Sequence, residues 1–165
     1  MSVKLQDKDD FLVGVISDTH GVLPPAAVKA FEGTDLIIHA GDIGKADILE
    51  ALRSIAPVVA VRGNMDYGEW AYGLPETEVV EIGKVLLYVL HDVYGLDVEP
   101  SVAGFSAVIS GHSHRPYVED VGGVLFINPG SAGQSEFRRP ASVALLHVRG
   151  ISLDAQFVEL EGASL

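Results

Sequence analysis

Carboxylate, imidazole and amide side chains recur in five short polar clusters along the chain. The clusters are Asp18-Thr19-His20, Gly41-Asp42, Gly63-Asn64, His91 and Gly111-His112-Ser113-His114. Oxygen and nitrogen ligands without thiolate suit Mn²⁺, Fe²⁺, Zn²⁺, Co²⁺ or Ni²⁺ rather than Ca²⁺. The residue types therefore indicate a transition-metal site, provided that the fold brings the clusters together.

The number and spacing of the candidate ligands favour two ions over one. Seven ligands are too many for one such ion but fit two ions that share a carboxylate at a separation of ~3.5–4 Å. In extended chain, residues i and i+2 point the same way, so Asp18 with His20, and His112 with His114, can each face one site. Any single cluster is weak evidence for a metal site, because Gly-Asp and Gly-Asn are ordinary turn dipeptides. The complete set is Asp18, His20, Asp42, Asn64, His91, His112 and His114.

In the first half of the chain, the clusters follow predicted strands. Apolar, β-branched runs at Phe11–Ser17, Asp35–Ala40 and Pro57–Val61 predict strands. Between them, Pro24-Pro25 opens a predicted helix through about Phe31, and apolar residues at helical spacing predict a helix over Lys45–Ile55. This βαβαβ order predicts parallel strands covered by helices.

The second half predicts shorter, largely antiparallel strands. The predicted elements are strands Thr77–Ile82 and Val85–Leu90 around Gly83-Lys84, a weak helix near Glu99–Gly104, strand Ala107–Ser110, the pair Tyr117–Asp120 and Val124–Ile127, and a closing hairpin of Ser142–Val148 and Ile151–Val158 over Arg149-Gly150. Two sheets packed face to face, with helices outside, would accommodate both halves. Ligands of open α/β sheets bind beyond the carboxyl ends of the strands, where all five clusters are expected.

Composition narrows the function further. The 165 residues predict a single domain over 1–165, with 48% apolar and 21% charged residues. A net charge of −12 argues against long nucleic acids or anionic membranes as partners, since both need clustered basic residues. The absence of cysteine excludes disulfides, thiolate zinc sites and a cysteine nucleophile. No apolar run approaches the ~18–20 residues of a membrane helix, and Phe11–Ile16 is shorter than the ~7–15 residues of a signal-peptide core, so a cytoplasmic protein is expected.

Taken together, the motifs resemble those of the calcineurin-like metallophosphoesterase superfamily. The resemblance lies in S-D-T-H-G, H-A-G-D, R-G-N-x-D, the lone His91 and G-H-S-H; the chain length and I-N-P-G-S at Ile127–Ser131 resemble its small YfcE-type branch. This resemblance implies an α/β fold, a four-layer α/β/β/α sandwich of two mixed β-sheets flanked by helices. It also implies a dinuclear metal-dependent phosphoesterase that hydrolyses phosphodiester bonds of a small phosphate-ester substrate.

The resemblance also implies a role for each ligand. Asp18, His20 and His114 would hold one ion, and Asp42 would bridge it to the second ion together with a water or hydroxide. That hydroxide would attack phosphorus in line with the leaving group. Manganese is the preferred metal, with nickel, cobalt, iron or zinc as alternatives.

Asn64, His91 and His112 would hold the second ion, and Asn64 and His91 are also the predicted catalytic contacts to the phosphate. Two positions depart from the family pattern. Met65 stands where many members have a histidine that can protonate the leaving oxygen, which leaves no side-chain general acid identified. The YfcE-type branch commonly lacks this histidine. Asp92 follows His91 where a glycine is usual, and could perturb the second ion's ligands.

Other polar and aromatic residues favour structural interpretations. His39 should point away from Asp42 and form hydrogen bonds rather than bind metal, and His147 lies far from the motifs. Residues 128–131 predict a tight turn that braces the site. Two further groups stay open between an anion or substrate contact, a subunit contact in a homo-oligomer, and plain solvent exposure: Arg138 with Arg139, and Tyr67, Trp70 and Tyr72.

A non-catalytic scaffold of the same fold is the alternative to the enzyme. One eukaryotic member of this branch, a subunit of the retromer coat, serves mainly in that way. The complete ligand set favours the enzyme, because a scaffold under no catalytic demand could have lost ligands. Turnover of a phosphodiester with added Mn²⁺ distinguishes the two.

Overall fold

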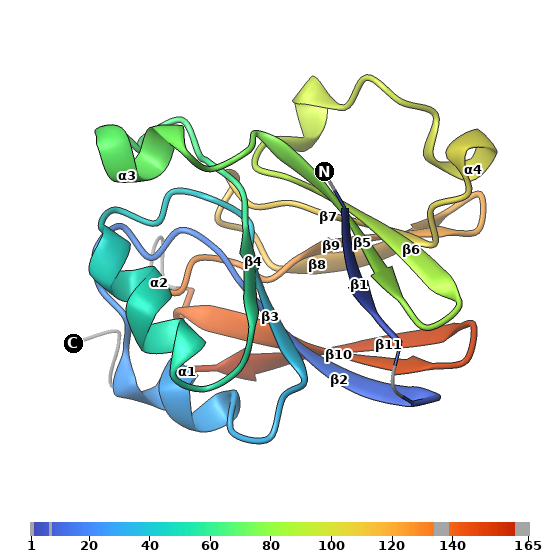
Figure 1. Ribbon diagram of the computed structural model, residues 1–165, viewed down its shortest axis with the longest axis horizontal. Coiled ribbons are helices and arrows are strands. Elements are labelled where there is room, and N and C mark those ends of the chain that lie inside the picture. Colours follow the sequence, from blue (N-terminus) through green and yellow to red (C-terminus); the bar gives the residue numbers. More distant parts are fainter. Residues whose placement is uncertain (1, 7, 134–138, 161–165) are drawn as a thin grey trace.

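Two β-sheets of mixed strand direction pack face to face (Figure 1). The computed structural model describes residues 2–6, 8–133 and 139–160. The first sheet has the spatial order β11 (Ser152–Glu159), β10 (Ser142–Arg149), β2 (Asp10–Ile16), β3 (Leu36–His39) and β4 (Val58–Ala60). The second has the order β1 (Ser2–Leu5), β5 (Thr77–Ile82), β6 (Val85–Leu90), β7 (Ala107–Ile109), β9 (Val124–Asn128) and β8 (Tyr117–Val121).

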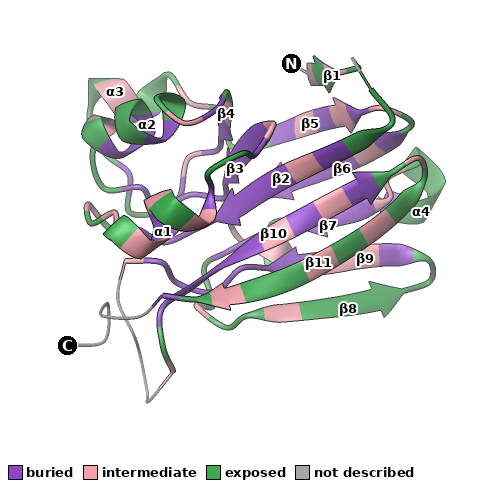
Figure 2. Ribbon diagram, turned by 90° about the horizontal axis from the view of Figure 1, so that it is seen from below, coloured by how far each residue is buried: buried purple, intermediate pink, exposed green. Residues whose placement is uncertain are grey.

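Side-chain alternation along the strands divides the core into layers. In β2, Val13 and Val15 face the second sheet and belong to the central cluster between the sheets, whereas Ile16 packs on the outer side. Because successive side chains of a strand point to opposite faces, both faces of β2 are buried. Figure 2 shows the result as largely buried β2 and β10 beside the more exposed edge strands β11 and β8.

Helices cover the outer face of the first sheet. These are α1 (Pro25–Ala30) and α2 (Ala46–Arg53), with the short α3 (Glu69–Tyr72) nearby. Leu49 and Leu52 of α2 are buried against this face, as is Phe31 at the end of α1. The helix predicted over Lys45–Ile55 is thus confirmed within narrower bounds, with Leu52 buried as its spacing predicts but Ala51 exposed.

The outer face of the second sheet has a thinner cover. It consists of the 3₁₀ turn η1 (Val93–Gly95), the single-turn helix α4 (Pro100–Ala103) and the chain between them. Tyr88 and Val108 on the sheet pack there with partly buried apolar residues of this segment, including Phe105. The predicted four-layer sandwich of two mixed sheets is confirmed, with a fourth layer that is mostly irregular chain.

The prediction of a largely antiparallel second half was wrong in part. Strand β7 pairs in parallel with both β6 and β9, because the crossing segments return the chain to the same end of the sheet. The closing hairpin β10–β11 joins the first sheet, where β10 runs antiparallel to β2. Its turn lies at Gly150-Ile151, one residue beyond the predicted position.

Three short elements were not predicted, one of which is the turn η1. Strand β1 lies in the charged N-terminal stretch and pairs in parallel with β5, and its residues Val3 and Leu5 pack partly against the central cluster. Helix α3 follows the third polar cluster. Within the described residues, no helix is both long enough and apolar enough to cross a membrane.

Phe31 anchors α1 over β2, and a glycine makes room for it. A Cβ on Gly14 would lie 2.7 Å from Cδ1 of the fully buried Phe31 ring. Gly14→Ala should therefore lower the free energy of unfolding by about 1–3 kcal/mol, the usual cost of overpacking. Chemical denaturation measures the change. Gly73→Ala is the control, because nothing lies within 4 Å of its added Cβ; a Gly14→Ala transition that matched the control would contradict this packing.

Candidate metal centre

The ends of strands from both sheets meet at one edge of the sandwich. The loop after β2 is bound to the loop after β3, since the Asp18 N–H donates to the Gly41 carbonyl at 3.0 Å and the His20 N–H to the Asp42 carbonyl at 3.0 Å. The loops after β6 and β7 are bound by the Gly111 N–H and the His91 carbonyl at 2.9 Å. Five loops of polar residues thus face a common space.

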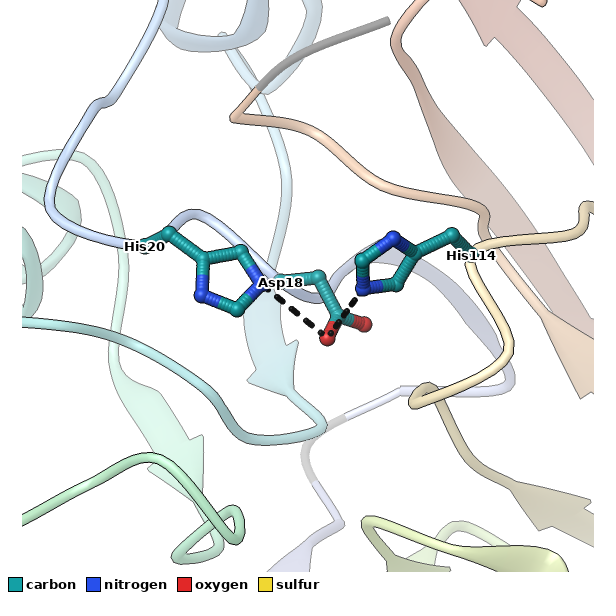
Figure 3. A group of neighbouring side chains, drawn as sticks. All are labelled: Asp18, His20 and His114. Atoms are coloured by element: carbon teal, nitrogen blue, oxygen red, sulfur yellow. Dashed lines mark ion pairs between the residues drawn. The ribbon is translucent and has the colours of Figure 1, made fainter. Parts of the chain in front are cut away.

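Asp18, His20 and His114 form the first group of ligand-type side chains (Figure 3). Asp18 Oδ1 lies 3.6 Å from His20 Nε2 and 3.2 Å from His114 Nε2. The carboxylate is fully buried. Its other oxygen, Oδ2, accepts hydrogen bonds from the Ser17 hydroxyl at 2.6 Å and the His112 N–H at 3.1 Å.

Asp18 Oδ1 is the oxygen left for a cation. Among the described residues, no N–H or O–H group donates a well-aligned hydrogen bond to it, although it is inaccessible to solvent. A buried charged oxygen without a donor costs free energy unless a cation or hydrogen bond compensates it. The residues of this group therefore fit a metal ion.

Asn64, His91 and His112 form the second group. His112 Nδ1 lies 3.2 Å from Asn64 Oδ1 and 3.3 Å from His91 Nε2. The Nδ1–H of His91 donates to the Ala40 carbonyl at 2.8 Å, and this bond leaves the Nε2 lone pair free for a metal. The three atoms converge from three different loops.

Asp42 lies between the two groups. Its Oδ2 is 3.4 Å from His91 Nε2 and 3.9 Å from His20 Nε2, while its Oδ1 accepts the Met65 N–H at 2.8 Å. One carboxylate thus faces both groups. The structure brings all seven residues singled out in the sequence into two adjoining clusters, although their binding of metal is a separate matter.

The backbone is unusual at five of these seven residues. Every non-glycine residue with positive φ in the described part of the chain belongs to the clusters: Asp18 (56°), His20 (47°), Asp42 (57°), His112 (68°) and His114 (62°). Left-handed conformations cost non-glycine residues of order 1 kcal/mol or more and gather at functional sites. They turn the chain sharply after β2, β3 and β7, so the extended-chain alternation expected for Asp18 with His20 and for His112 with His114 does not hold there, and His112 and His114 lie in different groups.

The charges of the cluster favour cations. Burial raises the pKa of Asp18, but contacts with His114, His20 and Ser17 outweigh burial and hold that pKa below its usual range. The pKa of His20 is raised, chiefly by its contact with Asp18. Burial lowers the pKa of His91, but Asp42 and Asp18 raise it by more. The buried carboxylates therefore create a site that attracts positive charge, which metal ions could supply in place of protons.

His39 lies outside the two ligand groups and forms hydrogen bonds to the loops that carry them. It is fully buried, and burial lowers its pKa to about 3, so the ring is neutral. Its Nδ1 accepts the Gly41 N–H at 3.1 Å, its Nε2–H faces the Thr19 hydroxyl at 3.0 Å, and that hydroxyl donates to the Ile43 carbonyl at 2.8 Å. This chain joins the loops that carry Asp18 and Asp42, as expected for a histidine outside the ligand set.

Asp66 is a positioning residue that the sequence analysis did not assign. Its carboxylate is buried and accepts the backbone N–H groups of Ile43 at 2.9 Å, Gly44 at 3.0 Å and Gly63 at 2.9 Å. It thereby fixes the Asp42 loop against the Asn64 loop. Asp66 is the aspartate of the R-G-N-x-D motif, but the motif alone does not indicate which groups this aspartate binds.

The predicted bracing turn lies directly beneath the loop after β7. Asn128 Nδ2 donates to the Gly111 carbonyl at 2.8 Å, and the Ser131 hydroxyl donates to the Asp18 carbonyl at 3.1 Å. Asp92, the other departure from the family pattern, lies with Oδ2 3.7 Å from His112 Nε2. It therefore faces the second group from outside.

The remaining candidates lie outside the clusters. His147 is in β10, opposite Leu12 of β2. Tyr67 and Tyr72 are exposed, while Trp70 is half-buried against the cluster beneath the helices. Arg138 lies outside the described residues, and no contact of Arg139 with the site is seen within them.

Comparisons with known proteins agree with this geometry. The chain is 41% identical over 133 residues to a probable metallophosphoesterase of Methanocaldococcus jannaschii, covering 73% of this chain and 67% of that protein. It is 28% identical over 154 residues to the phosphodiesterase YfcE of Escherichia coli, covering 79% and 84%. The fold is similar to that of Vps29 from Entamoeba histolytica in complex with Zn²⁺, with a TM-score of 0.72 and 24% identity over 91% of this chain and 99% of that one.

The sequence profile of the calcineurin-like phosphoesterase superfamily domain matches residues 11–150, which include all seven clustered ligand-type residues and every strand except the edge strands β1 and β11. The related phosphodiesterases support its YfcE-type branch. The chain belongs to the calcineurin-like phosphoesterase superfamily.

Proposed function

We propose that the protein is a dinuclear metal-dependent phosphodiesterase. The observation that carries the proposal is the position of Asp42, whose Oδ2 faces His20 of one ligand group and His91 of the other, with Asp18 Oδ1 buried and without a well-aligned donor among the described residues. The relatives named as phosphodiesterases support the diester as substrate.

In this proposal, Asp18, His20 and His114 hold one ion and Asn64, His91 and His112 hold the other. Asp42 would be shared by both ions, because its Oδ2 faces His20 of one group and His91 of the other. Two bound divalent ions would supply Lewis-acid activation of water and of the phosphoryl group. Manganese is the metal we expect first, with nickel, cobalt, iron or zinc as alternatives, because a donor set of oxygen and nitrogen suits each of them.

The substrate reaches the centre from the side on which Asn64 and His112 are exposed. A cleft of about 300 Å³ opens there and is lined by Asn64, His91 and His112 together with Arg62. Arg62 is held by Glu76 at 2.7 Å. Asn64, which is exposed at the cleft, could contact a bound phosphate as well as an ion, whereas His91 would act through the ion, because its Nδ1–H is bound to the Ala40 carbonyl and its Nε2 is the proposed ligand atom.

A non-catalytic scaffold is the second candidate, because the fold is similar to that of Vps29. In that case the clustered side chains would bind metal without turnover, and a surface would bind a partner protein. The complete set of seven ligand-type residues favours the enzyme.

Hydrolysis of bis(p-nitrophenyl) phosphate should depend on divalent metal. Exhaustive chelation should abolish the activity, and Mn²⁺ should restore it, because in this proposal the clustered acid–base side chains serve as ligands and water is activated by the bound ions. A panel of phosphomonoesters and phosphodiesters with Mn²⁺, Ni²⁺, Co²⁺ or Zn²⁺ measures both the metal and the ester preference. Activity in protein from which all metal has been removed would contradict the proposed mechanism. Metal binding without any turnover would favour the scaffold.

Asp42→Ala should be more damaging to metal binding than Asn64→Ala. The first change removes the one carboxylate that faces both groups, whereas the second removes one neutral ligand from one group. Metal analysis of protein equilibrated at the lowest free Mn²⁺ concentration that saturates the wild type should give nearly two ions in the wild type, about one in Asn64→Ala and fewer in Asp42→Ala. Two fully occupied ions in Asp42→Ala would show that the bridging role is wrong.

Met65 leaves the site without a side-chain proton donor at the leaving group. Its side chain is 52% exposed, and a thioether cannot donate a proton. His39 does not replace it, since both of its ring nitrogens are engaged in buried contacts. General acid catalysis typically contributes ~10²–10⁴-fold, so aryl phosphodiesters should be far better substrates than alkyl ones.

Met65→His should raise the rate for alkyl diesters more than the rate for aryl diesters. The backbone N–H of residue 65 still reaches Asp42 in this variant, and Met65→Leu serves as the control without a proton donor. The measurement is the dependence of kcat on leaving-group pKa, with chemistry rate-limiting. A flat dependence in the wild type would mean that another group already supplies the proton.

A further inference from the structure

A second cavity, of about 200 Å³, shares Asp92 and His112 with the cleft at the proposed metal centre. Turn η1 contributes Val93 and Tyr94 to its lining. The rest of the lining comes from the chain after β7: Gly111, Ser113, Arg115 and Tyr117. Whatever occupies this cavity lies next to a ligand of the second ion.

The cavity presents two aromatic side chains to solvent. Tyr94 is 95% exposed, while Tyr117 is half-buried at the start of β8. The hydrogen bond from its backbone N–H to Asp92 Oδ1, at 3.0 Å within η1, fixes the backbone of Tyr94, while the ring itself is exposed to solvent. An exposed aromatic ring beside a cavity offers a face on which another ring can stack.

Arg115 supplies a positive charge without an acidic partner. It lines the cavity and forms no ion pair within the described chain, whereas Lys8, Arg62 and Arg149 each have one. The backbone N–H of Arg115 donates to the Ser113 hydroxyl oxygen at 3.3 Å, and the same oxygen accepts a hydrogen bond from Asn128 Nδ2 at 3.2 Å. In a protein of net charge −12, an arginine that is unpaired within the described chain and lies beside the proposed metal centre attracts anionic or oxygen-rich groups to that place.

Asp92 is the one acidic residue in the lining. Its two oxygens face the Tyr94 N–H and His112 Nε2. The carboxylate therefore organises the wall of the cavity and leaves Arg115 available to a ligand.

The size of the cavity limits its occupant to one part of a substrate. Sites that enclose whole small molecules usually measure about 300–1,000 Å³. A space of about 200 Å³ fits one substituent, while the cleft beside Asn64 takes the phosphate.

We propose that this cavity binds the nucleoside of a nucleotide-type phosphodiester whose phosphate lies at the metal centre. The base stacks on Tyr94 and Tyr117, and Arg115 donates to oxygens of the base or sugar. This inference rests on the proposed function and gives it a substrate class. The substrate is a short one, because the net charge of −12 opposes a long nucleic acid.

Equilibrium binding to the Mn²⁺-loaded protein tests the cavity without turnover. Calorimetry should show thymidine 5′-monophosphate binding at least about tenfold more tightly than methyl phosphate, the order expected of one base–aromatic stack. Tyr94→Ala and Arg115→Gln should each weaken thymidine 5′-monophosphate about tenfold and change methyl phosphate by less than about twofold. Tyr94→Phe should keep the wild-type affinity, because the ring remains.

Lys84→Gln is the matched control for Arg115→Gln. It removes the same charge from an exposed position in the turn between β5 and β6. It should leave both affinities unchanged. Equal affinity of the wild type for the two ligands would overturn the inference, as would unchanged binding of thymidine 5′-monophosphate by Tyr94→Ala and Arg115→Gln.

Turnover separates failure of the inference from failure of the proposed function. Thymidine 5′-(p-nitrophenyl phosphate) and methyl p-nitrophenyl phosphate share one leaving group, so they differ only in the other substituent. Tyr94→Ala should lower kcat/KM about tenfold for the thymidine ester alone. An equal fall for both esters would overturn the inference. Tight, Tyr94-dependent binding without hydrolysis of either ester would support the cavity and refute the phosphodiesterase.

Discussion

The arrangement of the loops at the candidate metal centre depends on two buried carboxylates. Asp18 and Asp42 are almost completely removed from solvent, and buried negative charge is costly unless it is compensated. Each carboxylate turns one oxygen toward protein donors, the Ser17 hydroxyl and His112 N–H for Asp18 and the Met65 N–H for Asp42. The second oxygen of each carboxylate, Oδ1 of Asp18 and Oδ2 of Asp42, faces imidazole nitrogens. Positive charge at this place, from protons or from metal ions, would compensate the carboxylates.

The loops that hold these carboxylates are shaped by the same requirement. Left-handed backbone at Asp18, Asp42 and three histidines bends each loop so that neighbouring polar side chains point inward. Glycines allow the loops to approach closely; a Cβ on Gly111, for example, would overlap the Ser17 hydroxyl. Buried His39 and Asp66 then fix the loops by hydrogen bonds to backbone. A metal ion bound there would meet ligands that are already in place, which reduces the ordering cost of binding.

The sequence identified the residues that cluster at this edge of the sandwich but not the residues that support them. The clusters were recognisable because metal chemistry restricts residue type, and strand ends could be located from apolar runs such as Phe11–Ile16. Strand β1 escaped prediction because it is short, charged and stabilised by pairing with distant β5. The parallel pairing of β7 depends likewise on contacts far apart in sequence. The role of Asp66 was hidden because its partners are backbone N–H groups of another loop, which carry no signal of their own.

Anomalous X-ray diffraction at the manganese edge, from crystals of the protein equilibrated with Mn²⁺, tests the central claim most directly. The account predicts two anomalous peaks about 3.5–4 Å apart, both within bonding distance of Asp42 Oδ2. One peak should lie among Asp18, His20 and His114, and the other among Asn64, His91 and His112. A single peak, or two peaks that do not share Asp42, would contradict it.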